Sequence, residues 1–157
     1  MKKEKMNDKG FSLVELIIVI AIMAVLVIVL APQYLKYVEK SRNSTDVSNA
    51  TAIVTACQVW AADPDAGEGS TKAFTSGDTF EIKVTNSGGT TASDAVKSAL
   101  TEAAIDIAKT KSKSKNEWDA YTIKGTVKTD GSIEFTYEST VGTDTTDNGK
   151  FSTAMNK

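Results

Sequence analysis

Few residues of this chain are of a type that performs chemistry. It has no histidine and a single cysteine, Cys57, which excludes an intrachain disulfide, the usual Cys/His metal sites and catalysis by a histidine base. One carboxylate is notable for its position, because Glu15 directly precedes sixteen residues, 16–31, that carry no polar side chain. A carboxylate in such surroundings is expensive unless it is paired. Glu15 is therefore a candidate for a specific interaction.

The apolar run is long enough to cross a membrane. Residues 11–31 number 21 and would form about 31 Å of helix. Four lysines and two acids in residues 1–10 predict a cytoplasmic N-terminal end, with everything after Pro32 outside the membrane. A secretory signal fits poorly, because Glu15 lies inside the run and Pro32 would follow the cut. A plain anchor fits better but gives Glu15 no role. A helix that packs against copies of itself would give Glu15 one.

The helical pattern continues beyond the apolar run. We expect a helix core over 11–34 and an amphipathic continuation over 35–62, with a kink at Pro32, which lacks a backbone donor. The continuation carries one apolar stripe at steps of three and four residues. The stripe consists of Val47, Ala50, Val54, Cys57 and Ala61. Cys57 is therefore expected to be a small buried hydrophobe.

Residues 63–157 have the pattern of a small α+β head. Alternation predicts strands near 79–85, 120–128 and 132–138, the last two joined by an Asp-Gly hairpin turn, and the spacing predicts a helix near 92–109 capped by Thr91 or Ser93. The tail after Thr140 is expected to be loop-like with one short edge strand. The predicted fold class is thus α+β, with a long bent N-terminal helix whose stripe covers a small antiparallel sheet.

The stretch "KGFSLVELIIVIAIMAVLVIVLAPQY" (9–34) resembles the N-terminus of bacterial type IV prepilins and of the related pseudopilins. The resemblance implies a pilin-like fold, cleavage by a prepilin peptidase between Gly10 and Phe11, and N-methylation of Phe11. It also implies that Glu15 sets the register of the subunit in the filament and that Pro32 marks the kink. Many members close a C-terminal loop with a disulfide, which this chain is unable to form.

The position of Glu15 agrees with that role on physical grounds. Glu15 lies four residues after Phe11, so on a helix its carboxylate shares a face with the amine released by cleavage. In a filament, the amine of a neighbouring helix replaces this partner, and a wrong register leaves the carboxylate unpaired at a cost of about 3–5 kcal/mol. The charge therefore specifies register, as polar groups do in coiled coils.

The sequence thus predicts a structural protein, not an enzyme, with no cofactor. It would be a single-pass protein of the cytoplasmic membrane as a precursor and part of an extracellular filament, a type IV pilus or fimbrium, after assembly. Its expected partners are other pilin subunits, the prepilin peptidase, the assembly platform and, before assembly, membrane lipid. The alternatives are a minor pilin or a pseudopilin of secretion or DNA uptake, and a membrane-tethered module that binds a surface polymer.

Two polar clusters have simpler interpretations than ligand binding. The lysines in 109–115 are expected to form a solvated loop, and nucleic acid is not expected as a partner because no aromatic residue is interleaved. Asp144, Asp147 and Asn148 do not match the spacing of a helix–loop–helix calcium site, so no metal is expected there.

Overall fold

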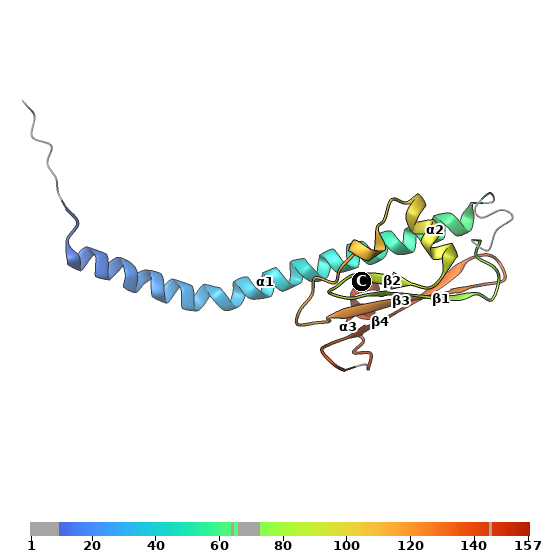
Figure 1. Ribbon diagram of the computed structural model, residues 1–157. Coiled ribbons are helices and arrows are strands. Elements are labelled where there is room, and N and C mark those ends of the chain that lie inside the picture. The colour runs from blue at the N-terminus through green and yellow to red at the C-terminus, as the bar shows by residue number, and fades with distance from the viewer. Residues whose placement is uncertain (1–9, 64, 66–72, 145) are drawn as a thin grey trace, which may run out of the picture. The chain divides into compact units, whose positions relative to one another are not determined.

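The computed structural model describes residues 10–63, 65, 73–144 and 146–157. Residues 1–9, which precede the expected cleavage site at Gly10, and most of the Pro- and Gly-containing segment 63–72 lie outside these described residues. The chain divides into two compact units, residues 1–38 and 39–157. Figure 1 labels the helices and strands.

The described part of the first unit is mainly apolar helix. Helix α1 (Leu13–Ala62) is 50 residues long and continues from this unit into the second. Each large apolar side chain from Leu13 to Leu30 is at least 47% exposed, far more apolar surface than a monomer leaves in water. By length and composition α1 is able to cross a membrane. It is helical on both sides of Pro32, and the kink predicted there stays a prediction.

The second unit contains a four-stranded antiparallel sheet. Its strands are β1 (Thr79–Val84), β2 (Gly89–Thr91), β3 (Ala120–Val127) and β4 (Ile133–Thr140), in the order β2-β1-β3-β4. Ile82 pairs with Ile123, which pairs with Tyr137, so apolar side chains share one face. The Asp-Gly hairpin between β3 and β4 is confirmed by their register. The three-residue strand β2 was not predicted, because Gly-Thr-Thr has no apolar alternation.

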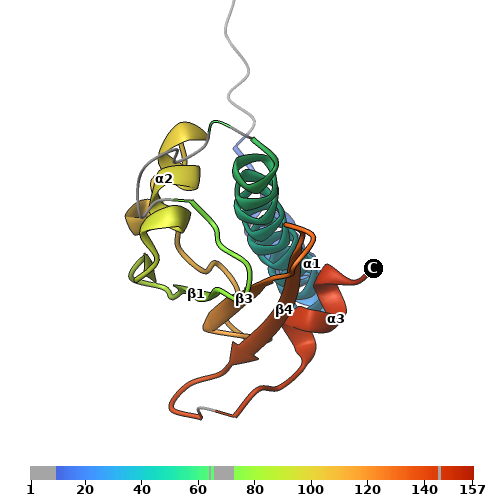
Figure 2. The ribbon, with the colours of Figure 1, turned by 90° about the vertical axis from the view of Figure 1, so that its right-hand side faces the viewer.

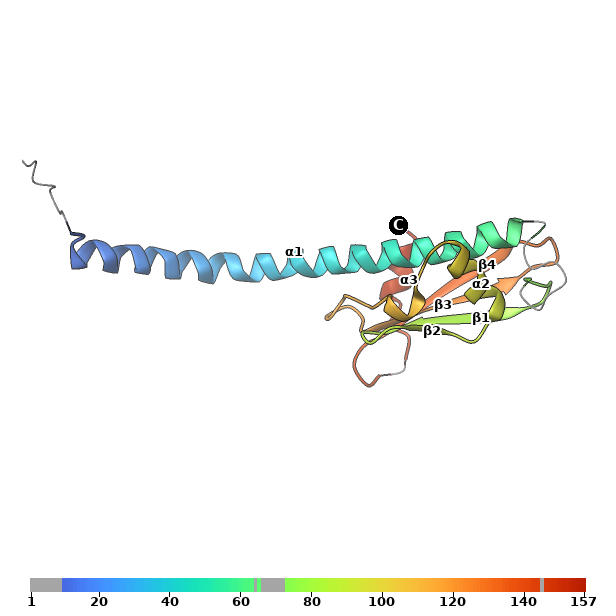
Figure 3. The ribbon, with the colours of Figure 1, turned by 45° about the horizontal axis from the view of Figure 1, so that its top comes forward.

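One face of the sheet is covered by helices. Residues of α1 after Val38 run along it, as Figures 1 and 3 show, and α3 (Lys150–Met155) lies beside α1 in Figure 2. The core joins Ala50, Ile53 and Cys57 of α1 to buried residues of β1 and β3, with Phe151 from α3. The α+β class, a long N-terminal helix packed on a small antiparallel sheet, is therefore confirmed.

The helix predicted near 92–109 is shorter than expected. Helix α2 (Asp94–Glu102) starts at the predicted cap Ser93, whose hydroxyl accepts a hydrogen bond from the Val96 N–H. It ends because Ala104 takes the left-handed conformation, φ 55°, with Ile105 N–H donating to the Leu100 carbonyl at 2.8 Å. Residues 107–109 form the separate 3₁₀ helix η1 (Ile107–Lys109).

The tail prediction was also wrong, since the segment after Thr140 contains α3 and, among its described residues, no strand. Asn148 fixes the start of α3. Its side-chain oxygen accepts hydrogen bonds from the Ser139 hydroxyl at 2.6 Å and from Lys150 N–H at 3.0 Å. These bonds hold the helix against β4, and Phe151 is fully buried and stacks on Tyr121 at 4.3 Å between ring centroids.

Gly125 on β3 leaves room for an aromatic side chain from the neighbouring strand. A Cβ atom at this position would lie 2.2 Å from the ring of Phe80, its partner on β1. We expect Gly125→Ala to displace that ring and lower the free energy of unfolding by about 1–3 kcal/mol. Thermal unfolding of the full chain in detergent measures the loss, and an unchanged midpoint would contradict it. The matched control is Thr126→Ala on the same strand. Gly131→Ala is unsuitable as a control, because the φ of Gly131 is 82° and alanine would strain the backbone there.

Candidate functional site

Glu15 closes the start of α1 by a local hydrogen-bond pair. The backbone N–H of Ser12 donates to Glu15 Oε2 at 2.8 Å, and the Ser12 hydroxyl accepts from Val14 N–H at 3.3 Å. This reciprocal arrangement is a capping box, with serine at the N-cap and glutamate three residues later. The sequence carries its signature, Ser-x-x-Glu, which was overlooked. In the uncut chain, the backbone of Ser12 is thus the partner of the Glu15 carboxylate.

The geometry at this end of the chain leaves the expected processing site accessible. Gly10 and Phe11 lie before the first helical residue, and the Phe11 side chain is 93% exposed. A Cβ atom at Gly10 would meet no atom within 4 Å, so nothing in this chain's own fold requires glycine there. A requirement for glycine would therefore come from an outside partner.

A second polar site was missed by the sequence prediction and involves a buried carboxylate on α1. Asp46 is fully buried. It accepts hydrogen bonds from Lys113 N–H at 2.8 Å and Ser114 N–H at 2.9 Å. The Ser112 hydroxyl at 3.2 Å and the indole N–H of Trp118 at 2.9 Å also donate to it. One carboxylate therefore fixes both the loop backbone and the buried tryptophan.

Glu39, seven residues earlier, holds the next part of the same loop. Its side chain accepts from Lys115 N–H at 2.7 Å, Asn116 N–H at 2.9 Å and the Ser114 hydroxyl at 2.8 Å. Residues seven apart share a helix face, so Glu39 and Asp46 bind one continuous segment, 112–118. We call these two acids and that segment the carboxylate clamp. Part of the predicted solvated loop is thus fixed to α1.

The clamp should make stability depend on pH. Burial raises the pKa of Glu39, but hydrogen bonds from Asn116 and Lys115, the Ser114 hydroxyl and Arg42 outweigh it and lower the pKa from 4.5 to about 2. Because the folded pKa is lowered, this stabilisation is present above about pH 4.5 and is lost as the pH falls toward 2.

We expect the stability of the Glu39→Gln variant to fall less steeply than that of the wild type as the pH is lowered from 5 to 2. The wild-type chain should lose about 2–3 kcal/mol more stability than the variant between pH 5 and pH 2. Denaturant titrations across this range measure the difference, with the exposed acid variant Glu134→Gln as control. Parallel pH profiles of wild type and Glu39→Gln would show that Glu39 does not carry the effect.

The remaining candidate residues lie in the core or hold turns in place. Cys57 is buried, and burial raises the pKa of its thiol to about 12, as expected of a core residue rather than a nucleophile. Asp147 accepts from Ser139 N–H at 2.8 Å and Gly149 N–H at 3.0 Å. Asp144 accepts from Thr146 N–H at 2.9 Å. These carboxylates cap turns, and so does Asn148.

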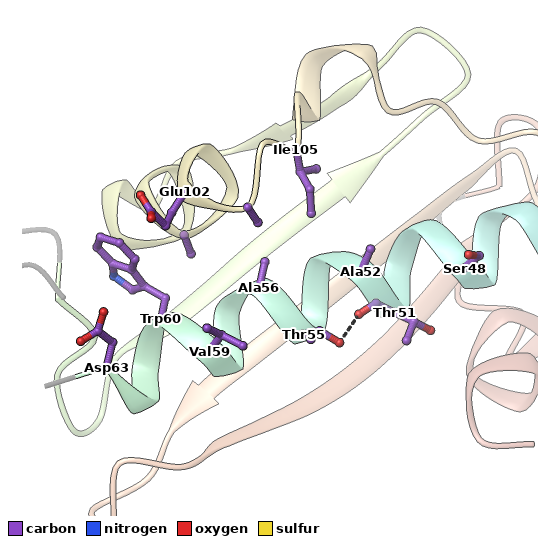
Figure 4. Close-up of a pocket in the computed structure, with 12 residues that line it drawn as sticks. Ser48, Thr51, Ala52, Thr55, Ala56, Val59, Trp60, Asp63, Glu102 and Ile105 are labelled. Atoms are coloured by element: carbon purple, nitrogen blue, oxygen red, sulfur yellow. Dashed lines mark hydrogen bonds between the residues drawn. The ribbon is translucent and has the colours of Figure 1, made fainter. Parts of the chain in front are cut away.

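A groove of about 810 Å³ lies between α2 and the last turns of α1. Figure 4 shows Val59 and Trp60 of α1 and Ile105 on its wall, with the carboxylates of Asp63 and Glu102 near the tryptophan. The Thr55 hydroxyl donates to the Thr51 carbonyl at 2.8 Å. The groove is a mainly apolar surface hollow whose polar lining consists of the hydroxyls of Ser48, Thr51 and Thr55, the Trp60 indole and these two acids.

Comparison with known proteins identifies the N-terminal segment. Residues 5–31 match the family described as the prokaryotic N-terminal methylation motif. The match covers Gly10, Phe11 and Glu15 and ends one residue before Pro32. No curated protein and no solved structure matched the chain.

The motif and the fold together define a class of protein. A methylation motif on an exposed apolar helix, followed by a helix-covered antiparallel sheet, supports a type IV prepilin-like protein. The motif accordingly supports a precursor of the type IV pilin or pseudopilin type, and α1 is long and apolar enough to cross a membrane. The motif implies processing by a prepilin peptidase, assembly with other subunits of this kind and a structural role rather than an enzymatic one.

Proposed function

We propose that this chain is the precursor of the structural subunit, or pilin, of a type IV pilus. Residues 1–10 form the leader, residues 11–34 anchor the precursor and later line the filament core, and residues 35–62 join that segment to the head, 63–157. The observation that carries the proposal is the methylation motif at the start of a helix whose large apolar side chains from Leu13 to Leu30 are all exposed in the single chain.

Each residue of the motif has a role in this proposal. The peptidase cuts between Gly10 and Phe11 and methylates the new amine of Phe11. Cleavage replaces a neutral peptide N–H by a charged amine near Glu15, whose carboxylate already accepts from the adjacent Ser12 N–H. Glu15 then pairs with an amine, its own or that of a neighbouring subunit, and thereby sets the register. Pro32 loosens one turn of the helix, so that the helices adjust to one another during packing.

The experiment that tests the proposal is mass spectrometry of filaments sheared from the cell surface. An abundant chain that begins at Phe11 and carries one additional methyl group is the expected result. The same processed chain at trace level beside a more abundant relative would indicate a minor pilin or pseudopilin. A full-length chain confined to the membrane would contradict the proposal and favour a tethered binding module.

Gly10→Glu is expected to block processing. Because a Cβ atom at residue 10 meets nothing within 4 Å in this chain, the substitution leaves the fold intact and acts only at the peptidase. Immunoblots should show a precursor about ten residues longer and at least a tenfold drop in sheared filaments. Normal cleavage of the variant would contradict the assignment of the cut, and Lys9→Gln serves as the control next to it.

A further inference from the structure

The carboxylate clamp presents a row of lysines to solvent. Ser112 and Ser114 are buried against Asp46 and Glu39, whereas Lys111, Lys113 and Lys115 alternate with them and are exposed. Exposed lysines and buried serines therefore alternate along 111–115, so the serines face α1 and the lysine side chains face solvent. We call these three residues the lysine row.

The ammonium groups of the row have no carboxylate partner in the described part of the chain. No ion pair among the described residues involves Lys111, Lys113 or Lys115, whereas the nearby Lys109 is paired with Asp106 at 2.7 Å. The clamp bonds the backbone N–H groups of Lys113 and Lys115 and not their ammonium groups. The row is thus held in place by its backbone, with its charges left for a partner.

The row belongs to the basic part of a chain that is otherwise acidic. After Gly10 the sequence has 14 basic and 18 acidic residues. Residues 35–46 and 109–118 together hold seven of the basic and three of the acidic ones, which leaves seven basic and fifteen acidic residues elsewhere. Two of those three acids, Glu39 and Asp46, are buried in the clamp. Exposed charge in these two segments is therefore strongly positive.

The clamp also limits how far the row can lie from the membrane. Lys115 is bonded through its backbone to Glu39, and Glu39 follows Tyr34, the last residue of the proposed membrane segment, by five positions. Five residues span at most about 18 Å when fully extended and about 7.5 Å as helix. Residues 34–39 lie within α1, so the helical value applies. The residue that holds the row therefore lies about one screening length, about 8 Å at physiological salt, along the helix from the proposed membrane segment.

We propose that the lysine row binds anionic phospholipid headgroups at the membrane surface while the precursor is anchored in the bilayer. The proposal rests on the membrane-anchored state of the proposed function. Lysines near an anionic surface each favour the bound state about fivefold, and anchoring by α1 supplies a high effective concentration of lipid. Lipid is favoured over nucleic acid because no aromatic side chain in the row offers a base a stacking surface.

The test uses the full chain in nanodiscs with a fluorophore beside the row. Asn116 is exposed and Cys57 is buried, so a cysteine introduced by Asn116→Cys takes the label while Cys57 does not. Quenching by nitroxide-labelled headgroups reports contact with the surface. We expect strong quenching with phosphatidylglycerol present, weak quenching with phosphatidylcholine alone, and release in 1 M salt.

The matched variants separate location from net charge. Replacing Lys111, Lys113 and Lys115 by glutamine should lower the bound-to-free ratio about a hundredfold. The same change at Lys83, Lys97 and Lys128, which are exposed elsewhere on the head, should leave it unchanged. The backbone N–H bonds of the clamp survive in both variants, and the lipid and salt comparisons on the wild type require no substitution.

Several results would overturn the proposal. The first is equal quenching with and without phosphatidylglycerol, and the second is unchanged quenching in the variant that lacks the lysine row. The third is an equal loss of quenching in the control variant with substitutions elsewhere on the head. A response to added duplex DNA but not to anionic lipid would assign the row to nucleic acid instead. Co-purification of the chain with nanodiscs tests the anchor separately, so a chain that inserts but shows no lipid dependence contradicts only the inference, and one that does not insert contradicts both.

Discussion

Glu15→Ala should reduce surface filaments by at least tenfold while the precursor is still made, inserted and cleaved. Among the described residues the carboxylate accepts one hydrogen bond, from Ser12 N–H, so its loss from the single subunit is expected to cost a helix cap, about 1 kcal/mol. In the proposed filament, the same loss would leave the amine of a neighbouring helix unpaired in an apolar bundle, at about 3–5 kcal/mol for each subunit. The assembled state therefore loses much more than the monomer.

Glu15→Gln separates the observed helix cap from the proposed register role of this residue. Glutamine retains an oxygen that accepts from Ser12 N–H, so the cap survives, but the charge that pairs with an amine is gone. We expect the glutamine variant to assemble as poorly as the alanine variant, with an unchanged yield of processed subunit in the membrane. Immunoblots of sheared and membrane fractions measure both quantities. Normal piliation of Glu15→Ala in a strain without other pilins would refute the register role.

Asp46→Ala should produce the largest loss of stability in the head, about 4 kcal/mol. The substitution removes one buried acceptor from four donors at once, two backbone N–H groups, the Ser112 hydroxyl and the Trp118 indole. Each buried donor left without a partner costs about 1–3 kcal/mol, reduced where the loop opens to water. We also expect the loop 112–118 to exchange its amide hydrogens faster, because its attachment to α1 is halved.

The measurement is denaturant unfolding of the full chain in detergent, followed by tryptophan fluorescence. Asp46→Asn keeps the size of the side chain but offers one acceptor oxygen instead of two, so its loss should be intermediate. Glu134→Ala, an exposed acid paired with Lys128 at 3.3 Å, should change stability by less than about 0.5 kcal/mol. A loss below 1 kcal/mol for Asp46→Ala would mean that the clamp adds little to the fold.

The sequence predicted the parts of this fold that depend on local pattern. Alternation located β1, β3 and β4, and the Asp-Gly pair located the hairpin turn, because each signal acts between residues close in the chain. The apolar stripe on α1 was recognised through Ala50 and Cys57, although Ile53 and Ala56, which are also buried, were left out of it. Ser93 was one of two proposed caps, and the structure selects it.

What the sequence did not reveal depends on contacts between distant residues. Glu39 and Asp46 are spaced by seven and continue the stripe through Ala50, so two acids on an apolar helix face were the available signal for a buried polar site. Their partners, however, lie more than sixty residues away. Nothing local indicates that Ala104 would take a left-handed conformation where glycine is usual, and the extent of α2 was therefore overestimated.

The hydrogen bonds of the clamp join residues 66 to 77 positions apart, a span that many secreted domains close with a disulfide. A cross-link over such a span would remove roughly 4 kcal/mol of entropy from the unfolded chain. Two carboxylates fasten the folded head without an oxidant, an isomerase or a second cysteine. The fastening between these distant segments therefore contains no bond that a reductant cleaves, and its formation needs no oxidation step.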